Sequence, residues 1–329
     1  MASRSTPTIP MIVDVDTGID DALALLYACA SPEVELLAVT CVSGNVHVDH
    51  AARNSMAMLD LGGRSDVEVA RGEETPLRRS LSFYQYVHGP SGLGNAVVPE
   101  LSRPLSERHA ADLIIERVAE RPGEITLVTL GPMTNLALAI EREPRLPGML
   151  RRLVFMGGAY RWPGNASPVA EANISMDPEA AERVFTSFGA SATAERPVAV
   201  GLDVTEQVLL TPGQLDAICG ANDGSPVARF LRDAVPFYFA YYATSRGFDG
   251  AAMHDPLALA AAVDPTLLRT TPAAVQVEVD GTHTTGQTVT DWRGQWEREP
   301  NLDVATGVEG EVFLARFVER LSGLVTASA

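Results

Sequence analysis

The chain has 329 residues, of which 25 are Lys or Arg and 42 are Asp or Glu, so its formal net charge is −17. A protein that binds nucleic acid or an anionic membrane needs a basic face, and the longest basic runs here are the pairs Arg78-Arg79 and Arg151-Arg152, so we expect neither partner. Hydrophobic residues make up 46%, which indicates a globular chain with a substantial core.

The first two thirds of the chain alternate short apolar stretches with segments of helical periodicity. The apolar stretches that predict strands are residues 11–13, 35–42, 124–130, 152–156 and 197–200. The segments that predict helices are residues 20–30, 48–61, 133–142 and 177–188. Strands that alternate with helices over short connections form a mostly parallel sheet covered on both faces. We therefore expect an α/β fold with an open, Rossmann-like sheet that binds ligands at the carboxyl ends of its strands.

The last third is predicted to be more helical. Its expected helices are residues 212–219, 227–245, 255–262 and 311–324. Two runs rich in Thr and Val, residues 274–279 and 285–290, predict a hairpin between the third and fourth of these helices. No repeat or low-complexity linker divides the chain. We expect one domain over residues 1–329, with residues 1–8 as a flexible N-terminus.

The cysteines indicate a reducing compartment. Cys29, Cys41 and Cys219 are odd in number, lie among apolar neighbours and lack the spacing of a zinc site. The first ten residues contain no apolar signal region, and no apolar run approaches the length of about 18 residues that suggests a membrane span. The expected location is the cytoplasm.

Four carboxylates follow the first predicted strand within eight residues. Asp14 and Asp16 are two positions apart and share one face of an extended chain, while Gly18 permits a tight turn that returns Asp20 and Asp21 toward them. Like charges this close raise one another's pKa, unless a cation or a shared proton offsets them. Carboxylates without nearby Cys or paired His select hard cations, so we expect Ca²⁺ or Mg²⁺.

Other interpretations of these residues remain open at this stage. Asp20 and Asp21 alone would fit an ordinary helix start, and the four carboxylates would also fit a metal-free acid/base dyad. Asn45 follows a predicted strand, but Asn after Gly is more often a turn residue than a ligand. The pair His254-Asp255 precedes a helix, where a cap is the more common role.

Taken together, these motifs resemble the inosine-uridine preferring nucleoside hydrolase family of ribonucleoside N-glycosidases. The family's D-x-D-x-x-x-D-D hallmark stands here at residues 14–21. Further matching segments, in the family's order, are residues 43–45, 87–90, 130–135, 156–158, 164–165, 168–173, 176–181, 201–205, 254–256 and 288–291.

The resemblance implies a calcium ion held by Asp16, Asp21, Asp255 and the main-chain carbonyl of Leu130. It also implies that water and the ribose 2′- and 3′-hydroxyls complete the coordination, which suits a cation that accepts six to eight oxygens. Asp16 resembles the general base that activates water, and Asp14 resembles a supporting residue. The residues that match the ribose pocket are Asp20, Asn45, Met156, Asn165, Glu171 and Asn173.

The implied reaction is hydrolysis of the N-glycosidic bond through an oxocarbenium-like ribosyl cation, with inversion at the anomeric carbon. His254 resembles the acid that protonates the leaving base, and His88, in a Gly-rich loop, is expected at the base or the substrate rim. The resemblance further implies a homodimer or homotetramer and a role in nucleoside salvage.

The base preference is open in the sequence. Aromatic candidates for the base site are Phe83, Tyr84, Phe237, Tyr238, Tyr241 and Tyr242, although an aromatic stripe at helical spacing is more often core. Trp162 precedes the ribose-loop Asn165 and is expected near the mouth. Two other functions remain as alternatives. One is a phosphatase of the D-x-D-x-T type, based on residues 14–17, and the other is a calcium-dependent nucleoside or sugar sensor without turnover.

Overall fold

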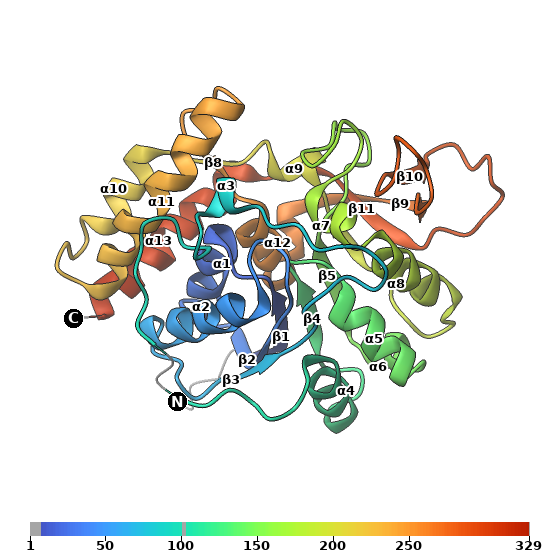
Figure 1. Cartoon of the computed structure of the whole chain (residues 1–329), viewed down its shortest axis with the longest axis horizontal. Coiled ribbons are helices and arrows are strands. Elements are labelled where there is room, and N and C mark those ends of the chain that lie inside the picture. The colour runs from blue at the N-terminus through green and yellow to red at the C-terminus, as the bar shows by residue number, and fades with distance from the viewer. Residues whose placement is uncertain (1–7, 101–102, 329) are drawn as a thin grey trace, which may run out of the picture.

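The computed structural model describes residues 8–100 and 103–328 (Figure 1). Residues 1–7 of the expected flexible N-terminus lie outside the described residues. A nine-stranded sheet runs through the molecule in the order β10-β9-β11-β6-β5-β4-β1-β2-β3. In chain order, its strands are β1 (Ile9–Val15), β2 (Val34–Cys41), β3 (Glu68–Arg71), β4 (Thr126–Thr129), β5 (Arg152–Met156), β6 (Val198–Val200), β9 (Leu268–Val277), β10 (Thr288–Asp291) and β11 (Leu302–Val308).

The sheet is parallel from β3 to β11 and antiparallel at one edge. β1 pairs in parallel with both β2 and β4, so that Val13 lies between Val39 and Val128. β9 pairs antiparallel with both β11 and β10, which confirms the expected late hairpin. The mostly parallel α/β sheet predicted from the sequence is confirmed.

Two hydrophobic cores cover the two faces of the sheet. Met11 and Val13 belong to one core and Ile12 to the other, because successive side chains of a strand point to opposite faces. The helices that contribute to the first core are α1 (Ile19–Cys29), α2 (Val48–Leu61), α10 (Pro212–Cys219), α11 (Pro226–Ser245), α12 (His254–Val263) and α13 (Gly310–Ala327). Those of the second are α4 (Ala110–Glu120), α5 (Thr134–Arg142), α6 (Leu146–Met149) and α8 (Pro178–Ala190).

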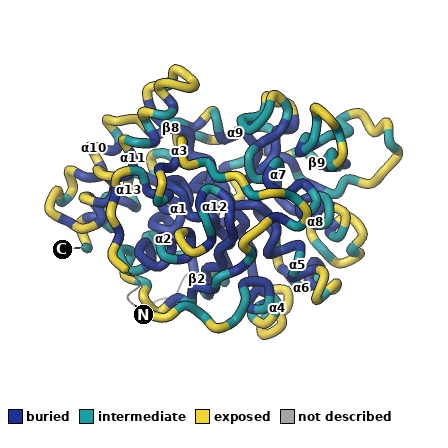
Figure 2. The backbone as a smooth tube through the Cα atoms, viewed as in Figure 1, coloured by how far each residue is buried: buried dark blue, intermediate teal, exposed yellow. Residues whose placement is uncertain are grey.

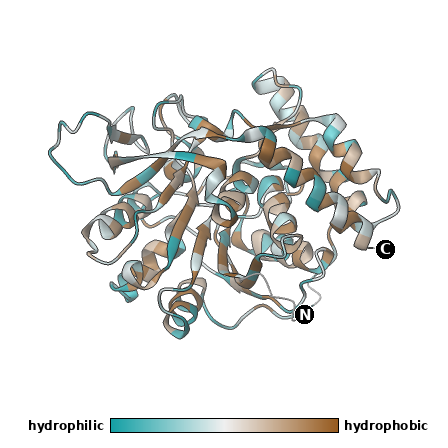
Figure 3. Ribbon diagram, turned by 180° about the vertical axis from the view of Figure 1, so that it is seen from behind, coloured by the Kyte–Doolittle hydropathy of each residue, from teal (hydrophilic) through white to brown (hydrophobic). Residues whose placement is uncertain are grey.

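The figures show the same layering. Most strand residues and the inner helix faces are buried, and the exposed positions lie mainly on outer helix faces, in loops and in the first half of β9 (Figure 2). Seen from behind, the central strands are mostly hydrophobic (Figure 3). In the described part of the chain, no helix combines the length and the hydrophobicity needed to cross a membrane.

Several predicted boundaries agree with the structure, while some elements lacked a sequence signal. The segments at residues 48–61, 152–156 and 212–219 form α2, β5 and α10 with the expected ends. Four elements of the sheet and its covering helices, β3, β11, α4 and α6, were not predicted. β11 pairs with β6 on one side and β9 on the other, so tertiary pairing supports a strand whose own sequence includes Thr306 and Gly307.

Short elements at the carboxyl ends of the parallel strands shape the site (Figure 1). They are α3 (Gln85–His88), α7 (Ala172–Met176), α9 (Leu202–Thr205), β7 (Leu209–Leu210) and β8 (Ala251–Ala252), while the 3-10 helix η1 (Pro265–Leu267) follows α12. β7 and β8 pair antiparallel, and the Met253 N–H donates to the Val208 carbonyl at 2.9 Å. This pairing places His254, the next residue, beside the end of α9.

Candidate active site

The acidic cluster forms at the carboxyl end of β1. Asp14 lies in the strand, Asp16 follows it, and the turn at Gly18 starts α1 with Asp20 and Asp21 in its first turn. The Asp21 carboxylate accepts hydrogen bonds from the Gly18 N–H at 2.8 Å and from the Asp16 N–H at 3.3 Å. All four carboxylates are buried. The turn predicted from Gly18 therefore brings them together.

Burial raises the pKa of every carboxyl group in this cluster. The pKa rises to about 7 for Asp14 and to about 6 for Asp20 and Asp21, chiefly by desolvation, with repulsion from Asp21 adding to the effect at Asp14 and from Asp20 at Asp21. Asp255 is the second residue of α12. Its pKa is raised first by burial and then by its acidic neighbours. Oxygens of Asp20, Asp21 and Asp255 lie within 4.8 Å of one another. This donor set fits a hard divalent cation.

Asp16 adjoins this trio through the segment after β2. The Asn45 N–H donates to Asp16 Oδ2 at 2.6 Å, and Asn45 Nδ2 reaches Asp21 Oδ2 at 3.2 Å. Gly44 makes this approach possible, because a Cβ there would overlap the Asp16 carboxylate. Asn45 is thus a partner of the acidic cluster and not only a turn residue.

Asp14, the carboxylate of the cluster that lies within β1, has hydrogen-bond partners of its own. The Thr40 hydroxyl donates to Asp14 Oδ1 at 2.6 Å, and Asn135 Nδ2 donates to the same oxygen at 2.8 Å. Asp14 Oδ2 is buried without a partner among the described residues. Asn135 lies in the matched segment at residues 130–135, but the resemblance gave it no role, because its contact with Asp14 joins residues 121 positions apart.

The loop between β5 and α7 and the start of α7 supply further polar residues of the site. Glu171 Oε1 accepts the Asn173 N–H at 2.8 Å, and its Oε2 accepts the Gly158 N–H at 3.0 Å. Asn173 Nδ2 donates to the main-chain carbonyl of Leu130 at 2.6 Å. Asn165 Oδ1 accepts the Ala172 N–H at 2.9 Å. These bonds hold the loop side chains in fixed positions.

His254 takes part in a chain of hydrogen bonds that reaches the acidic cluster. Its Nε2 lies 2.6 Å from the Tyr242 hydroxyl, and its Nδ1 lies 2.7 Å from the Thr205 hydroxyl. Tyr242 lies 3.5 Å from the Tyr238 hydroxyl, which donates to Asp20 Oδ2 at 3.2 Å. Burial, with smaller contributions from His88 and Arg246, lowers the pKa of His254 to about 3, so its resting form is neutral.

His88 differs from its expected place in a loop. It ends the short helix α3, is buried, and accepts the Ile19 N–H at Nδ1 over 3.1 Å. Its ring stacks on Tyr238 with centroids 5.5 Å apart. Burial lowers its pKa to about 4. Because its ring stacks on Tyr238 and its Nδ1 accepts a main-chain N–H, the buried His88 forms part of the wall of the site.

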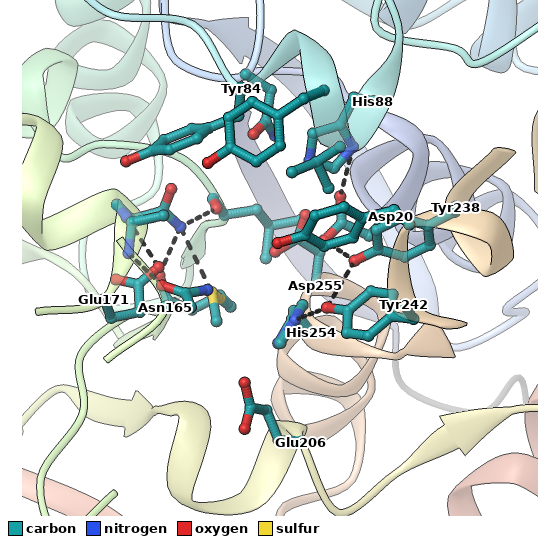
Figure 4. Close-up of a pocket in the computed structure, with 18 of the residues that line it drawn as sticks. Asp20, Tyr84, His88, Asn165, Glu171, Glu206, Tyr238, Tyr242, His254 and Asp255 are labelled. Carbon is teal, nitrogen blue, oxygen red and sulfur yellow. Dashed lines mark hydrogen bonds and ion pairs between the residues drawn. The ribbon is translucent and has the colours of Figure 1, made fainter. Parts of the chain in front are cut away.

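One pocket gathers these side chains (Figure 4). The predicted site residues that line it are Asp20, Asn45, His88, Leu130, Met156, Asn165, Glu171, Asn173, His254 and Asp255. Asp14, Asp16 and Asp21 are not among its lining residues and are buried beside it. The aromatic and charged residues that complete the lining are Tyr84, Tyr86, Tyr238, Tyr241, Tyr242, Glu206 and Arg246.

Several aromatic expectations are corrected by this pocket. Phe83 and Phe237 are not among its lining residues, whereas Tyr86, which was not a candidate, is. Trp162 is 42% exposed and also stands outside the lining, although its Nε1 donates to Glu206 at 2.7 Å. Helical spacing alone does not show which face of α11 is directed to the site. It also does not show which residues of the segment before Gly89 reach the pocket.

Comparisons with known proteins agree with this geometry. The sequence model of the family described as inosine-uridine preferring nucleoside hydrolase matches residues 11–315. An inosine-uridine preferring nucleoside hydrolase of Crithidia fasciculata is 38% identical over 313 residues, which cover 94% of this chain and 96% of that protein. Uridine nucleosidase 1 of Arabidopsis thaliana is 38% identical over 309 residues, which cover 92% and 89%.

A solved structure supports the same assignment. The purine-preferring ribonucleoside hydrolase from Gardnerella vaginalis superposes with a TM-score of 0.90 at 37% sequence identity, covering 97% of this chain and 99% of that chain. The chain therefore belongs to the inosine-uridine preferring nucleoside hydrolase family, a family of hydrolases that act on N-glycosyl compounds.

Proposed function

We propose that this chain hydrolyses the N-glycosidic bond of ribonucleosides to ribose and free base, with calcium as its cofactor and nucleoside salvage as its role. The observation that carries the proposal is one pocket that contains the buried carboxylates of Asp20 and Asp255 together with a Tyr–His hydrogen-bond chain that reaches Asp20. The relatives differ in the bases that their names give, so the proposal does not rank purines against pyrimidines.

Calcium would be held by Asp16, Asp21, Asp255 and the carbonyl of Leu130. The fit is supported by the buried oxygens of Asp20, Asp21 and Asp255, which lie within 4.8 Å of one another and carry raised pKa values that a cation would offset. When bound, a divalent cation supplies positive charge that makes a nearby water more acidic and orients hydroxyl groups.

The ribose would lie between the acidic cluster and the loop before α7. Asp20 and Asn45 line one side of the pocket, and Asn165, Glu171 and Asn173 line the other, with Met156 beside them. Glu171 is a rigid acceptor, because three main-chain N–H groups, those of Gly158, Asn173 and Ile174, fix its carboxylate. A polyhydroxylated ring requires such fixed donors and acceptors.

Asp16 is proposed as the general base for the attacking water. Its carboxylate is buried and accepts the Asn45 N–H, which orients it, and desolvation raises its pKa, which makes it a stronger base than an exposed carboxylate. Asp14 would support it from below, through its hydrogen bonds with Thr40 and Asn135.

The leaving base would receive its proton from the His254–Tyr242 pair. Since His254 is neutral and both of its nitrogens are engaged, the Tyr242 hydroxyl, which lines the pocket, is the group placed to donate. His254 Nε2, 2.6 Å away, would stabilise the resulting Tyr242 phenolate by a hydrogen bond, and the phenolate would regain its proton from solvent water after the products leave. His88 would contact the substrate from the wall that it shares with Tyr238.

The test is product release by the purified chain from inosine, uridine, cytidine and adenosine, with calcium or with excess chelator. Free base is read by chromatography and ribose as reducing sugar, and bound metal is measured by elemental analysis. Release of both products that stops with chelator supports the proposal. Bound calcium without release from any of the four nucleosides would favour the sensor alternative.

The variant Asp16→Asn separates catalysis from binding. We expect its turnover to fall by about 100- to 10,000-fold, the usual contribution of a general base, while some nucleoside binding remains. Asp223→Asn is the matched control, because Asp223 is an exposed surface partner of Arg232. Equal turnover in Asp16→Asn and the wild type would remove Asp16 from this role. The phosphatase alternative has no support beyond residues 14–17.

We also propose a single domain over residues 1–329, a homodimer or homotetramer, and a cytoplasmic location. The single domain is supported by one sheet that contains strands from both halves of the chain. The location is supported by the three free cysteines, Cys29, Cys41 and Cys219. The acidic net charge of −17 supports the absence of nucleic acid and anionic membrane partners.

A further inference from the structure

Two charged side chains of the pocket have no part in the metal site or the proton path. Glu206 and Arg246 both line the pocket, and Arg246 Nη2 lies 3.2 Å from Glu206 Oε1. In Figure 4, Glu206 stands beyond His254, on the side away from Asp20 and His88. A ribose bound at the carboxylates, with its base at His254, would direct the outer edge of that base toward this pair.

The chain itself fixes Glu206 beside His254. Glu206 follows Thr205, whose hydroxyl contacts His254 Nδ1 at 2.7 Å, and its N–H ends α9 by donating to the Leu202 carbonyl. The charge of Glu206 also affects Tyr242. Burial is the largest cause of the raised pKa of the Tyr242 phenol, and the carboxylates of Asp20 and Glu206 also raise it. Glu206 therefore neighbours both residues of the proposed proton path.

Two neighbours hold the Glu206 carboxylate in place. Trp162 Nε1 donates to Oε2 at 2.7 Å, and Arg246 pairs with Oε1. The Glu206 side chain is only 6% exposed, so water cannot freely satisfy it. An ionised carboxylate has about four acceptor sites and no donor, and these neighbours leave some of them free. The pocket thus contains an oriented group that only accepts hydrogen bonds.

We infer that Glu206 determines base specificity by accepting a hydrogen bond from an N–H group on the outer edge of the base, while Arg246 donates to the adjacent ring nitrogen or carbonyl oxygen. This inference rests on the proposed function. A base with only lone pairs at that edge would give the Glu206 carboxylate no hydrogen bond. Those lone pairs would also be repelled by the negative charge of the carboxylate. A buried charged acceptor that loses its donor costs about 10- to 100-fold in kcat/KM.

The test compares inosine, which carries an N1–H, with purine riboside, which presents only the N1 lone pair. The variant Glu206→Gln keeps the side-chain shape but adds an N–H donor. For each enzyme, kcat/KM for inosine is divided by kcat/KM for purine riboside. We expect this ratio to be about 10- to 100-fold lower in Glu206→Gln than in the wild type, mainly through KM. The intrinsic reactivities of the two nucleosides cancel when the two ratios are divided.

Two further variants make the test specific. Trp162→Phe removes the N–H that orients the carboxylate but keeps the charge, so the same ratio should fall by a smaller factor. Glu195→Gln, at an exposed carboxylate in the loop before β6, should leave the ratio unchanged. If Glu206→Gln fails to fold, the Trp162→Phe ratio decides. For an enzyme that accepts only pyrimidines, uridine and 3-methyluridine replace the purine pair.

The outcomes separate this inference from the proposed function. An unchanged ratio in Glu206→Gln, with inosine or uridine still hydrolysed, would overturn the role of Glu206 and leave the hydrolase assignment intact. Absence of release from all nucleosides by the wild type, with calcium bound, would overturn the proposed function and this inference with it. A lowered ratio in Glu206→Gln but not in Glu195→Gln supports the inference.

Discussion

A missing side chain controls the position of the proposed general base. The Gly44 backbone lies against Asp16, and a Cβ at position 44 would overlap Oδ2 and come within 2.7 Å of Cγ. The next residue, Asn45, then donates its N–H to the same carboxylate at 2.6 Å. Gly44 and Asn45 both contact the Asp16 carboxylate. One methyl group added at position 44 would therefore displace both Asp16 and the Asn45 N–H that donates to it.

We therefore expect Gly44→Ala to lower activity more than stability. Displacing a catalytic group by about 1 Å can cost about 100-fold in rate, whereas added core volume costs about 1–3 kcal/mol of unfolding free energy. Turnover and thermal unfolding would be measured together. Gly213→Ala is the control, because a Cβ at Gly213 meets nothing within 4 Å. Full turnover in Gly44→Ala would show that the site tolerates this displacement.

Local spacing predicted part of the site, the resemblance supplied distant residues such as His254 and Asp255, and residues with neither signal were missed. Asp16 and Asp21 are brought together by a single turn at Gly18, so their positions could be inferred. Asn135 reaches Asp14 from 121 positions away, and Glu206 meets the pocket through the end of a four-residue helix. The hydrophobic periodicity of the sequence does not predict such contacts.

At the scale of elements, α11 connects the two ends of the site. Tyr238 and Tyr242 are four residues apart, so they lie on the same helix face, where one hydroxyl reaches Asp20 and the other reaches His254. The aromatic stripe of α11 was predicted to be core, and this is partly correct, since Phe230 and Tyr238 are buried in the first core. A buried Tyr satisfies both roles because its ring packs while its hydroxyl bonds.

The variant Tyr242→Phe tests this connection, because it keeps the ring and removes the hydroxyl. We expect kcat to fall by about 100-fold or more, as for the loss of an acid catalyst. We also expect stability to fall by about 1–3 kcal/mol, since His254 Nε2 loses its partner in a buried site. Tyr27→Phe is the control, because it removes a hydroxyl from another buried ring of the first core that is not among the lining residues of the pocket. Equal kcat in the two variants would contradict the proposed path.

Five of the parallel strands, β1, β2, β4, β5 and β6, could be predicted because each is a short apolar run bounded by turn residues, whereas β3 and β11 could not. β9 was predicted only in part, from residue 274, because its first half contains the exposed residues Arg269 and Thr270. That half is held by antiparallel pairing with β11 and not by its own hydrophobicity. Strands with buried side chains carry their own signal, while strands at a sheet edge depend on their neighbours.

At the scale of the whole molecule, the acidic cluster links stability to pH and to metal. Asp14, Asp20 and Asp21 have pKa values raised to between about 6 and about 7, above the ordinary value of 3.8. Without metal, the folded state therefore binds protons more tightly than the unfolded state. The stability that these protons contribute is present below pH 4 and is lost as the pH rises through about 6 to 7.

A bound divalent cation replaces those protons, so its effect should run in the opposite direction. We expect calcium at about 100 times its dissociation constant to stabilise the fold by about 2.7 kcal/mol at pH 8, and by much less at pH 5, where protons compete for the same oxygens. Thermal unfolding at both pH values, with calcium or chelator at matched ionic strength, measures this difference. Asp255→Asn should lose most of the calcium response, whereas Asp223→Asn, on the surface, should retain it. An equal calcium shift at pH 5 and pH 8 would mean that calcium stabilises the fold from a site other than these carboxylates.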